Sequence, residues 1–175
     1  MVTPTPIVKE ELAINRRSLW GYLLVFLLLP SFLFAAAPFK TERGRTADDF
    51  TLLDLEKNKV SLSDFKGKPV ILMFWTTSCP FCRSELKLLN SKIERFAKQG
   101  VELLTIDAGE PLYRAQNFMQ RYGFSLRVLL DEDTQVAFDY GILGVPTYIF
   151  IDRNGKIVAE RNSFSEKAYS QILAD

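Results

Sequence analysis

The sequence predicts an α/β domain in which helices cover a central mixed sheet. Three observations lead to this prediction. Continuous apolar runs at residues 69–75, 101–107 and 147–152 have the length and composition of buried strands. Between them lie stretches with apolar residues every three or four positions, as in amphipathic helices. Strands that alternate with helices form a sheet covered on its faces, and 175 residues suffice for one such domain.

The first half of the domain combines a hairpin, a buried strand and a long helix. Two short strand-like runs around Lys57-Asn58-Lys59 predict a hairpin within residues 50–65. The apolar strand at 69–75 follows. We then expect a helix over residues 80–99, with Gly100 as a suitable stop. The apolar face of this helix is Leu86, Leu89, Ile93 and Phe96.

The second half continues the alternation and ends in a second hairpin. Pro111 suits the first turn of a helix and Gly123 its C-terminal end. Arg153-Asn154-Gly155 lies between two apolar runs and predicts a tight turn that joins two strands. The expected elements are strands at 101–107, 127–131, 147–152 and 156–160, and helices at 111–123, 131–141 and 165–174.

The composition argues against several classes of function. The chain has no histidine, so it can form neither a Ser-His-Asp triad nor a Cys-His pair. Its two cysteines cannot close a four-ligand zinc site, and we expect no metal and no cofactor. Beyond residue 39 there are 19 basic and 19 acidic side chains. This balance leaves no excess of positive charge for nucleic acid, which we do not expect as a partner.

The N-terminal part of the chain contains a long apolar segment. Residues 18–39 carry no charged side chain, and 22 residues are enough to cross a bilayer as a helix. Trp20 and Tyr22 lie near one end, where amphipathic rings favour the membrane interface. We therefore expect a short cytoplasmic N-terminus at 1–17, a transmembrane anchor at 18–39, a linker at 40–47 and the folded domain at 48–175.

A cleaved signal peptide is the alternative interpretation of this segment. Small residues at 35–37 offer a cleavage site, but Pro38 would then directly follow the cleaved bond. The apolar run also exceeds the roughly 7–15 residues of a signal-peptide core. Basic residues flank the segment on both sides, so orientation is predicted from the cysteines instead. A lone cysteine pair is most useful where disulfides persist, which places the domain outside the cytoplasm, in a periplasm, a lumen or on an outer face.

The only two cysteines, Cys79 and Cys82, lie where a buried strand gives way to a helix. A helix N-terminus favours thiolate over thiol, so Cys79 is predicted to attack substrates. Cys82, one turn further, would resolve the mixed disulfide. Pro80 suits the first helical position. A purely structural disulfide between the two would close too small a loop to stabilise the fold much, and we therefore predict a redox pair.

The chain from Asp48 to about Phe164 resembles the thioredoxin superfamily, in particular its membrane-tethered TlpA/ResA-like thiol–disulfide oxidoreductases. The stretches that carry the resemblance are DDFTLLDLEKNKVSLSDFKGKPVILMFWTTSCPFCRSEL and YGILGVPTYIFIDRNGKIV. The resemblance implies a thioredoxin-like fold, with a redox-active Cys79–Cys82 disulfide and a cis bond before Pro146. It also implies that Glu85 tunes the thiols or transfers protons. Substrate contacts are implied at Trp75, Pro80, Phe81, Val145 and Pro146.

The sequence departs from the family pattern at three places. Met73 stands where many thioredoxins have a buried acid, and Ser78 where a tryptophan often precedes the first cysteine. The loop RNSFSEK at 161–167 lacks a glycine often found there. Because Met73 cannot take a proton, proton transfer would depend on Glu85, water or the substrate.

The resemblance favours a reductant of exported proteins, fed by an upstream membrane thiol–disulfide donor, with cytochrome c maturation as the usual setting. The alternative is an oxidase that donates disulfides, because proline after the first cysteine also occurs in oxidising relatives. A peroxiredoxin-like peroxidase is suggested by Thr76, three residues before Cys79, but the adjacent Cys82 argues against it. A copper-delivery protein would need a histidine, which this chain lacks.

Overall fold

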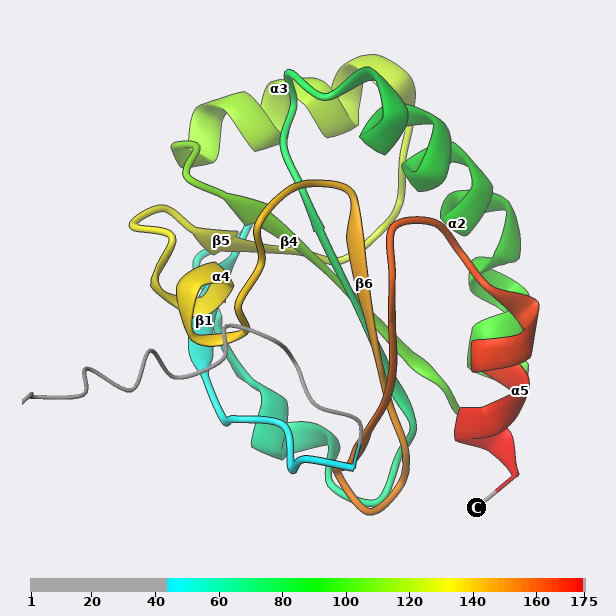
Figure 1. The fold of residues 1–175 in the computed structure, drawn as a ribbon. Helices are drawn as coiled ribbons and strands as arrows, with labels where there is room; N and C mark the ends of the chain where they lie inside the picture. Colours follow the sequence, from blue (N-terminus) through cyan, green and yellow to red (C-terminus); the bar gives the residue numbers. More distant parts are fainter. Residues whose placement is uncertain (1–43, 175) are drawn as a thin grey trace, which may run out of the picture. The chain divides into compact units, whose positions relative to one another are not determined.

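A twisted seven-stranded sheet forms the centre of the molecule (Figure 1). The computed structural model describes residues 44–174. The strand order is β2-β1-β5-β4-β3-β6-β7. The strands are β1 (Thr51–Asp54), β2 (Lys59–Ser61), β3 (Val70–Trp75), β4 (Glu102–Ala108), β5 (Val128–Asp131), β6 (Thr147–Ile151) and β7 (Ile157–Arg161).

The sheet is mixed, as the sequence predicted. Strand β3 pairs with β4 in parallel and with β6 in antiparallel orientation, and β4 pairs with β5 in parallel. All six residues of β3 are buried, because a strand in the middle of a covered sheet has no solvent face. The N-terminal hairpin is confirmed, and β1 joins the sheet through antiparallel pairing with β5. The hairpin therefore extends the central sheet.

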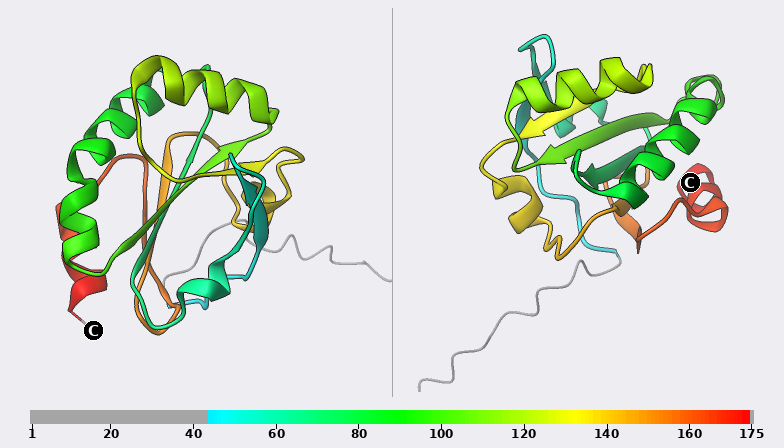
Figure 2. Two further views of the ribbon diagram at one scale, coloured as in Figure 1. Left: turned by 180° about the vertical axis from the view of Figure 1, so that it is seen from behind. Right: turned by 90° about the horizontal axis from the view of Figure 1, so that it is seen from above.

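Helices cover both faces of the sheet, and the two views of Figure 2 show their arrangement around it. On one face, α2 (Pro80–Lys98), α3 (Leu112–Tyr122) and α5 (Glu166–Leu173) contribute buried residues to the same core cluster. On the other face, α4 (Gln135–Asp139) packs with the N-terminal hairpin, and the 3-10 helix η1 (Leu62–Phe65) lies against this second cluster. The predicted helices are confirmed, although α4 is shorter than the predicted helix at 131–141 because Asp131 belongs to β5. The 3-10 turn has no counterpart among the expected elements.

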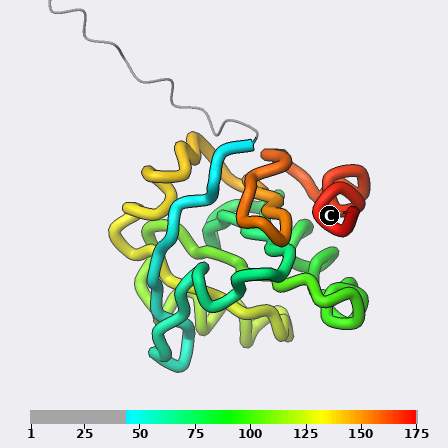
Figure 3. The backbone as a smooth tube through the Cα atoms, turned by 90° about the horizontal axis from the view of Figure 1, so that it is seen from below, coloured from blue at the N-terminus to red at the C-terminus, as the bar shows by residue number. Residues whose placement is uncertain are grey.

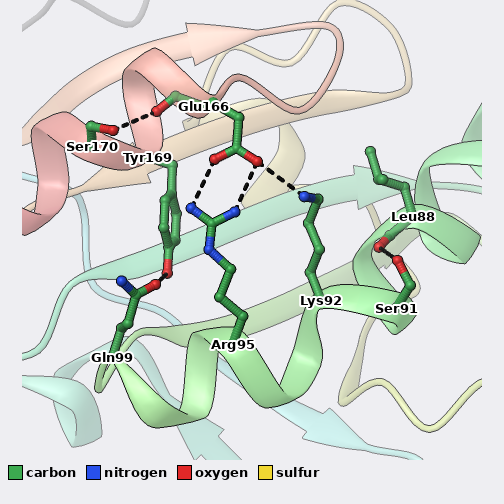
Figure 4. Close-up of polar contacts among 8 residues, drawn as sticks. All are labelled: Leu88, Ser91, Lys92, Arg95, Gln99, Glu166, Tyr169 and Ser170. Carbon is green, nitrogen blue, oxygen red and sulfur yellow. Dashed lines mark hydrogen bonds and ion pairs between the residues drawn. The ribbon is translucent and has the colours of Figure 1, made fainter.

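Helix α5 is fastened to α2 by a group of polar side chains (Figure 4). The Glu166 carboxylate accepts hydrogen bonds from both terminal nitrogens of Arg95, at 2.9 and 3.0 Å, and from Lys92 at 3.0 Å. One turn on, the Tyr169 hydroxyl bonds to Gln99, and its ring packs 5.2 Å from that of Phe96. These contacts fix the position of the loop that leads into α5.

The first described residues lie along the sheet end opposite the start of α2. The amide of Gly44 donates to the carbonyl of Ile157, and Thr46 forms an isolated bridge with Lys156. Figure 3 shows this segment, in cyan, beside the β6–β7 turn, in orange. The predicted N-terminus at 1–17 and anchor at 18–39 lie outside the described residues. Between residues 44 and 174, no helix is long and apolar enough to span a membrane.

Candidate active site

Cys79 and Cys82 are joined in a disulfide at the N-terminus of α2. Strand β3 ends at Trp75, and the chain turns through three residues before the first cysteine. Cys79 is the N-cap of the helix, and its sulfur accepts the backbone N–H of Cys82 at 3.1 Å. Cys79 is partly exposed, whereas Cys82 is completely buried. The two cysteines are therefore placed as the sequence predicted, with Cys79 at the mouth of the helix and Cys82 more deeply buried.

The surroundings of the pair favour a thiolate on Cys79 once the disulfide is reduced. Helix α2 is 19 residues long, and its first turn contains no acidic residue. The unpaired N–H groups and the positive end of the helix dipole therefore act on the sulfur without a nearby carboxylate in that turn. Pro80 occupies the first helical position, where no N–H is needed.

The loop before β6 lies directly against the outer cysteine. The peptide bond between Val145 and Pro146 is cis, as expected from the resemblance. The carbonyl oxygen of Val145 lies 3.7 Å from the Cys79 sulfur. Asn162 donates to the carbonyl of Pro146 at 3.4 Å, so the loop before α5 supports this segment from behind. The loop at 161–167 therefore contacts the cis-proline segment although it lacks the glycine often found there.

Glu85 is held beneath the start of α2 and is not a solvated surface residue. One of its oxygens accepts the Tyr148 hydroxyl at 2.7 Å and the backbone N–H of Phe164 at 3.0 Å. Burial, followed by the hydrogen bond to Glu85, raises the pKa of Tyr148 far above its usual value, so the tyrosine always donates. The carboxylate is thus fixed three residues after the inner cysteine, within the helix that carries both sulfurs.

The expected substrate-contacting residues divide into two groups. Pro80 is exposed and Phe81 is 76% exposed, so both are available to a partner. Trp75, in contrast, is wholly buried and packs 5.2 Å from the ring of Phe118. Contact between Trp75 and a substrate, as expected from the resemblance, is therefore not what the structure shows. The side chain belongs to the core cluster that also contains Cys82, and it shields the pair from below.

Sequence reasoning missed two features near the cysteines. Leu143 is 86% exposed, two residues before the carbonyl that faces Cys79, and an isolated leucine in a loop gave no signal. Glu110 is nearly buried and accepts the backbone N–H of Thr77 at 2.5 Å and its hydroxyl at 2.7 Å. Thr77 lies in the turn that delivers Cys79. A carboxyl directly after a buried strand, in the motif Ile-Asp-Ala-Gly-Glu, was the available signal for Glu110.

Met73 is completely buried on β3. Its thioether neither donates nor accepts a proton at this position, so the position of the buried acid in many thioredoxins is apolar here. Thr76, the basis of the peroxidase alternative, shares a hydrogen bond of 3.2 Å with the hydroxyl of Ser78.

The sequence profile described as the AhpC/TSA family matches residues 43–160. The chain belongs to this family. It is 40% identical over 126 residues to the thiol-disulfide oxidoreductase ResA of Geobacillus thermodenitrificans, which covers 69% of this chain and 72% of that protein. It is 36% identical over 121 residues to ResA of Bacillus thuringiensis, a match that covers 69% of this chain and 70% of that protein. The family resemblance predicted from the sequence is confirmed.

Solved structures agree with this assignment. A thiol:disulfide interchange protein DsbE from Chlorobium tepidum superposes with a TM-score of 0.70 at 29% identity, covering 77% of this chain and 98% of that one. The thioredoxin domain of a thiol-disulfide oxidoreductase from Bacteroides vulgatus superposes with a TM-score of 0.66 at 29% identity. The match covers 75% of this chain and 95% of that one. The chain is a thiol–disulfide oxidoreductase with a thioredoxin-like fold, and it exchanges disulfides with protein thiols.

Proposed function

We propose that this ResA-like protein reduces disulfides of exported proteins outside the cytoplasm, with cytochrome c maturation as its setting. The observation that carries the proposal is the position of Cys79. Its sulfur is the N-cap of a 19-residue helix and lies 3.7 Å from the Val145 carbonyl. A partly exposed sulfur beside the Val145 carbonyl suits an extended peptide, which docks by strand-like hydrogen bonds.

The reaction proceeds through two thiol–disulfide exchanges. The Cys79 thiolate attacks one sulfur of the substrate disulfide, forms a mixed disulfide and releases the other substrate sulfur as a thiolate, which takes up a proton. The Cys82 thiol then loses its proton, and its thiolate attacks the Cys79 sulfur. The substrate leaves with two thiols, and the two electrons that it gained came from the cysteine pair, which is now the disulfide seen here.

A dithiol donor must then return two electrons and two protons to the Cys79–Cys82 disulfide. Because the domain is proposed to lie outside the cytoplasm, this donor would be a membrane protein that carries electrons across the bilayer. The uncharged segment at 18–39 would keep the two together at the membrane. The proposed membrane location is supported by the apolar sequence of this segment and by the family to which the chain belongs.

The reduction potential of the full-length chain, measured by equilibration with dithiothreitol or glutathione at neutral pH, tests the direction of electron flow. A potential near that of thioredoxin, about −270 mV, supports a reductant, whereas a value near about −120 mV would assign disulfide donation instead. C79S and C82S serve as controls that cannot form the intramolecular disulfide. In C82S, the mixed disulfide with a protein substrate should persist, because the resolving thiol is missing.

A further inference from the structure

The buried carboxyl of Asp107 has no hydrogen-bond partner. Asp107 lies near the C-terminal end of β4, and its residue exposure is zero. Among residues 44–174, neither of its carboxylate oxygens accepts a hydrogen bond. Buried polar atoms in native proteins nearly always have a partner, so a carboxyl with two unsatisfied oxygens requires an explanation. The exchange reaction described above does not use it.

Asp107 lies on the side of the sheet that holds the redox pair. It is aligned with Trp75 in the parallel pairing of β3 and β4, and neighbouring strands lie about 4.8 Å apart. Side chains alternate along a strand, so Asp107 faces the same side as Leu103, which belongs to the cluster of Trp75 and Cys82. A carboxyl is therefore next to the tryptophan that underlies the cysteines.

The charged groups around Asp107 come from the segment that follows β4. Burial, followed by the negative charge and the contact of Glu110, raises the pKa of Asp107 to about 8, while the charge of Arg114 on α3 opposes this. Burial also acts on Glu110, but hydrogen bonds from Thr77 outweigh it and lower the pKa of Glu110. The residues paired with Asp107 on the neighbouring strands are uncharged: Trp75 on β3 and Leu130 on β5.

Two adjacent carboxyl groups explain the unsatisfied oxygens. Two carboxylates are both acceptors, so neither can bond to the other when both are ionised. When one is protonated, its O–H donates to the other and the pair keeps a single negative charge. The environment decides which group holds the proton: Thr77 donates to Glu110, and nothing in the described chain donates to Asp107.

We propose that Asp107 and Glu110 share one proton at neutral pH and act together as positioning residues for the cysteine pair. The proton is held on Asp107, and the charge is held on Glu110. Glu110 in turn fixes Thr77 through two hydrogen bonds, and Thr77 precedes Cys79 by two residues. The pair thus orders the turn that delivers the attacking sulfur, and it keeps a second negative charge away from the thiolate.

Loss of the shared proton has a defined effect on the redox equilibrium. An ionised Asp107 adds a buried negative charge beneath the cysteines, which disfavours the thiolate of the reduced form and therefore favours the disulfide. A surface pocket of about 270 Å³ adjoins the groups that donate hydrogen bonds to Glu110. Thr77 and Arg114, which both bond to Glu110, line this pocket.

The experiment measures the equilibrium constant for reduction of the full-length chain by dithiothreitol between about pH 6 and pH 9. D107N keeps the shape of the side chain, and its amide donates to Glu110 as the protonated carboxyl would. E110Q gives Asp107 a donor and removes the neighbouring charge. D131N is the matched control: Asp131 is equally buried at a strand end, but it bonds to α4 and faces the other layer.

The proposal predicts equal pH dependence for the wild type and D107N near pH 6. Near pH 9, the constant of the wild type should fall about threefold or more below that of D107N, because only the wild type acquires the second charge. In E110Q the fall should begin at lower pH. D131N should follow the wild type. A D107N profile that parallels the wild type up to pH 9, or a D131N profile that deviates as much, would overturn the proposal.

A direct titration keeps the test independent of folding in the variants. Carboxyl carbon NMR of the wild-type protein should show one aspartate that titrates near pH 8 and is absent in D107N. Titration of Asp107 below about pH 6 would contradict the pair. The inference rests on the exchange activity of the cysteines and not on the direction of electron flow. A reduction potential near about −120 mV at pH 7 would refute the proposed reductant. The pH profiles would still test the shared proton of Asp107 and Glu110.

Discussion

Tyr148 on β6 donates its hydroxyl hydrogen to Glu85 on α2, with 2.7 Å between the two oxygens. The same carboxylate oxygen accepts the backbone N–H of Phe164, so two segments from the C-terminal half fix one glutamate of the cysteine helix. A carboxylate held by two donors keeps its position while the sulfurs above it change their bonding. The charge of Glu85 and its fixed position can therefore be tested by separate substitutions.

E85Q tests the charge, because the amide oxygen can accept both hydrogen bonds in place of the carboxylate. We expect disulfide exchange to slow by on the order of 100-fold, the low end of what a positioned acid–base group contributes. Y148F tests the placement and should cost about 1 kcal/mol of stability through the lost hydrogen bond, with a much smaller effect on rate. Stopped-flow measurement of exchange with a model disulfide checks both. Equal rates for E85Q and the wild type would leave Glu85 with a structural role only.

Leu143 and Phe81 form an exposed apolar pair on either side of the redox site. They are 86% and 76% exposed, one preceding the cis-proline loop and the other within the cysteine motif. Exposed large apolar side chains next to a reactive sulfur are suited to binding a substrate peptide. F81A and L143A should each raise KM for a disulfide-containing peptide about threefold or more while leaving the unfolding midpoint unchanged.

The control for this prediction is L88A. Leu88 is 38% exposed on α2, further along the helix from the cysteines. Its replacement should leave KM for the same peptide unaltered. If F81A and L143A leave KM at the L88A value, substrates bind elsewhere on the surface.

The sequence was sufficient to predict the order and type of nearly every element. Apolar runs such as Val70–Trp75 can only be accommodated as buried strands here, and Gly123, with a φ of 64°, ends α3 as expected. The position of β1 next to β5 was not predictable from the sequence, because it depends on the edge of the sheet with which the hairpin pairs. Strand order is a property of the assembled sheet and not of any local pattern.

The site was predictable to the extent that its residues are close in sequence. Cys79, Cys82 and Pro146 carry recognisable local motifs, and the structure shows the predicted disulfide and the predicted cis bond. The partners of Glu85 lie 63 and 79 residues further along the chain, so no local pattern connects them. Asp107 was visible as the single charge near the end of the strand 101–107. That its carboxyl is buried and has no hydrogen-bond partner among the described residues could not be predicted, because both depend on the folded structure.

The contacts between α2 and α5 should contribute little to stability at ordinary temperature. Glu166 accepts from Arg95 and Lys92, but Glu166 and Arg95 are solvent-exposed and Lys92 is only partly buried. Exposed ion pairs gain little, because water screens their charges. E166Q should lower the unfolding midpoint by about 2 °C or less. The difference should vanish near 1 M salt, where screening is nearly complete. A larger loss that persists in high salt would mean that Glu166 holds α5 by hydrogen-bond geometry.

Asp107 should make the stability of the oxidised protein depend on pH. Its pKa is raised by burial and by Glu110 from 3.8 to about 8 in the folded protein. Between these values the folded state holds a proton that the unfolded state has released. The stabilisation from Asp107 is therefore complete below about pH 4 and is lost as the pH rises to about 8.

D107N abolishes this titration, so the comparison between the two proteins isolates it. From about pH 5 to pH 8, the free energy of unfolding of the wild type should fall relative to that of D107N by up to about 1.4 kcal/mol per pH unit. Urea unfolding at several pH values gives these energies. D54N is the control: hydrogen bonds from Asn58 and Glu56 outweigh the opposing effect of burial and lower the pKa of Asp54. Its effect is therefore constant in this range. Parallel curves for the wild type and D107N would show that Asp107 is already ionised at pH 5 and that no proton is shared with Glu110.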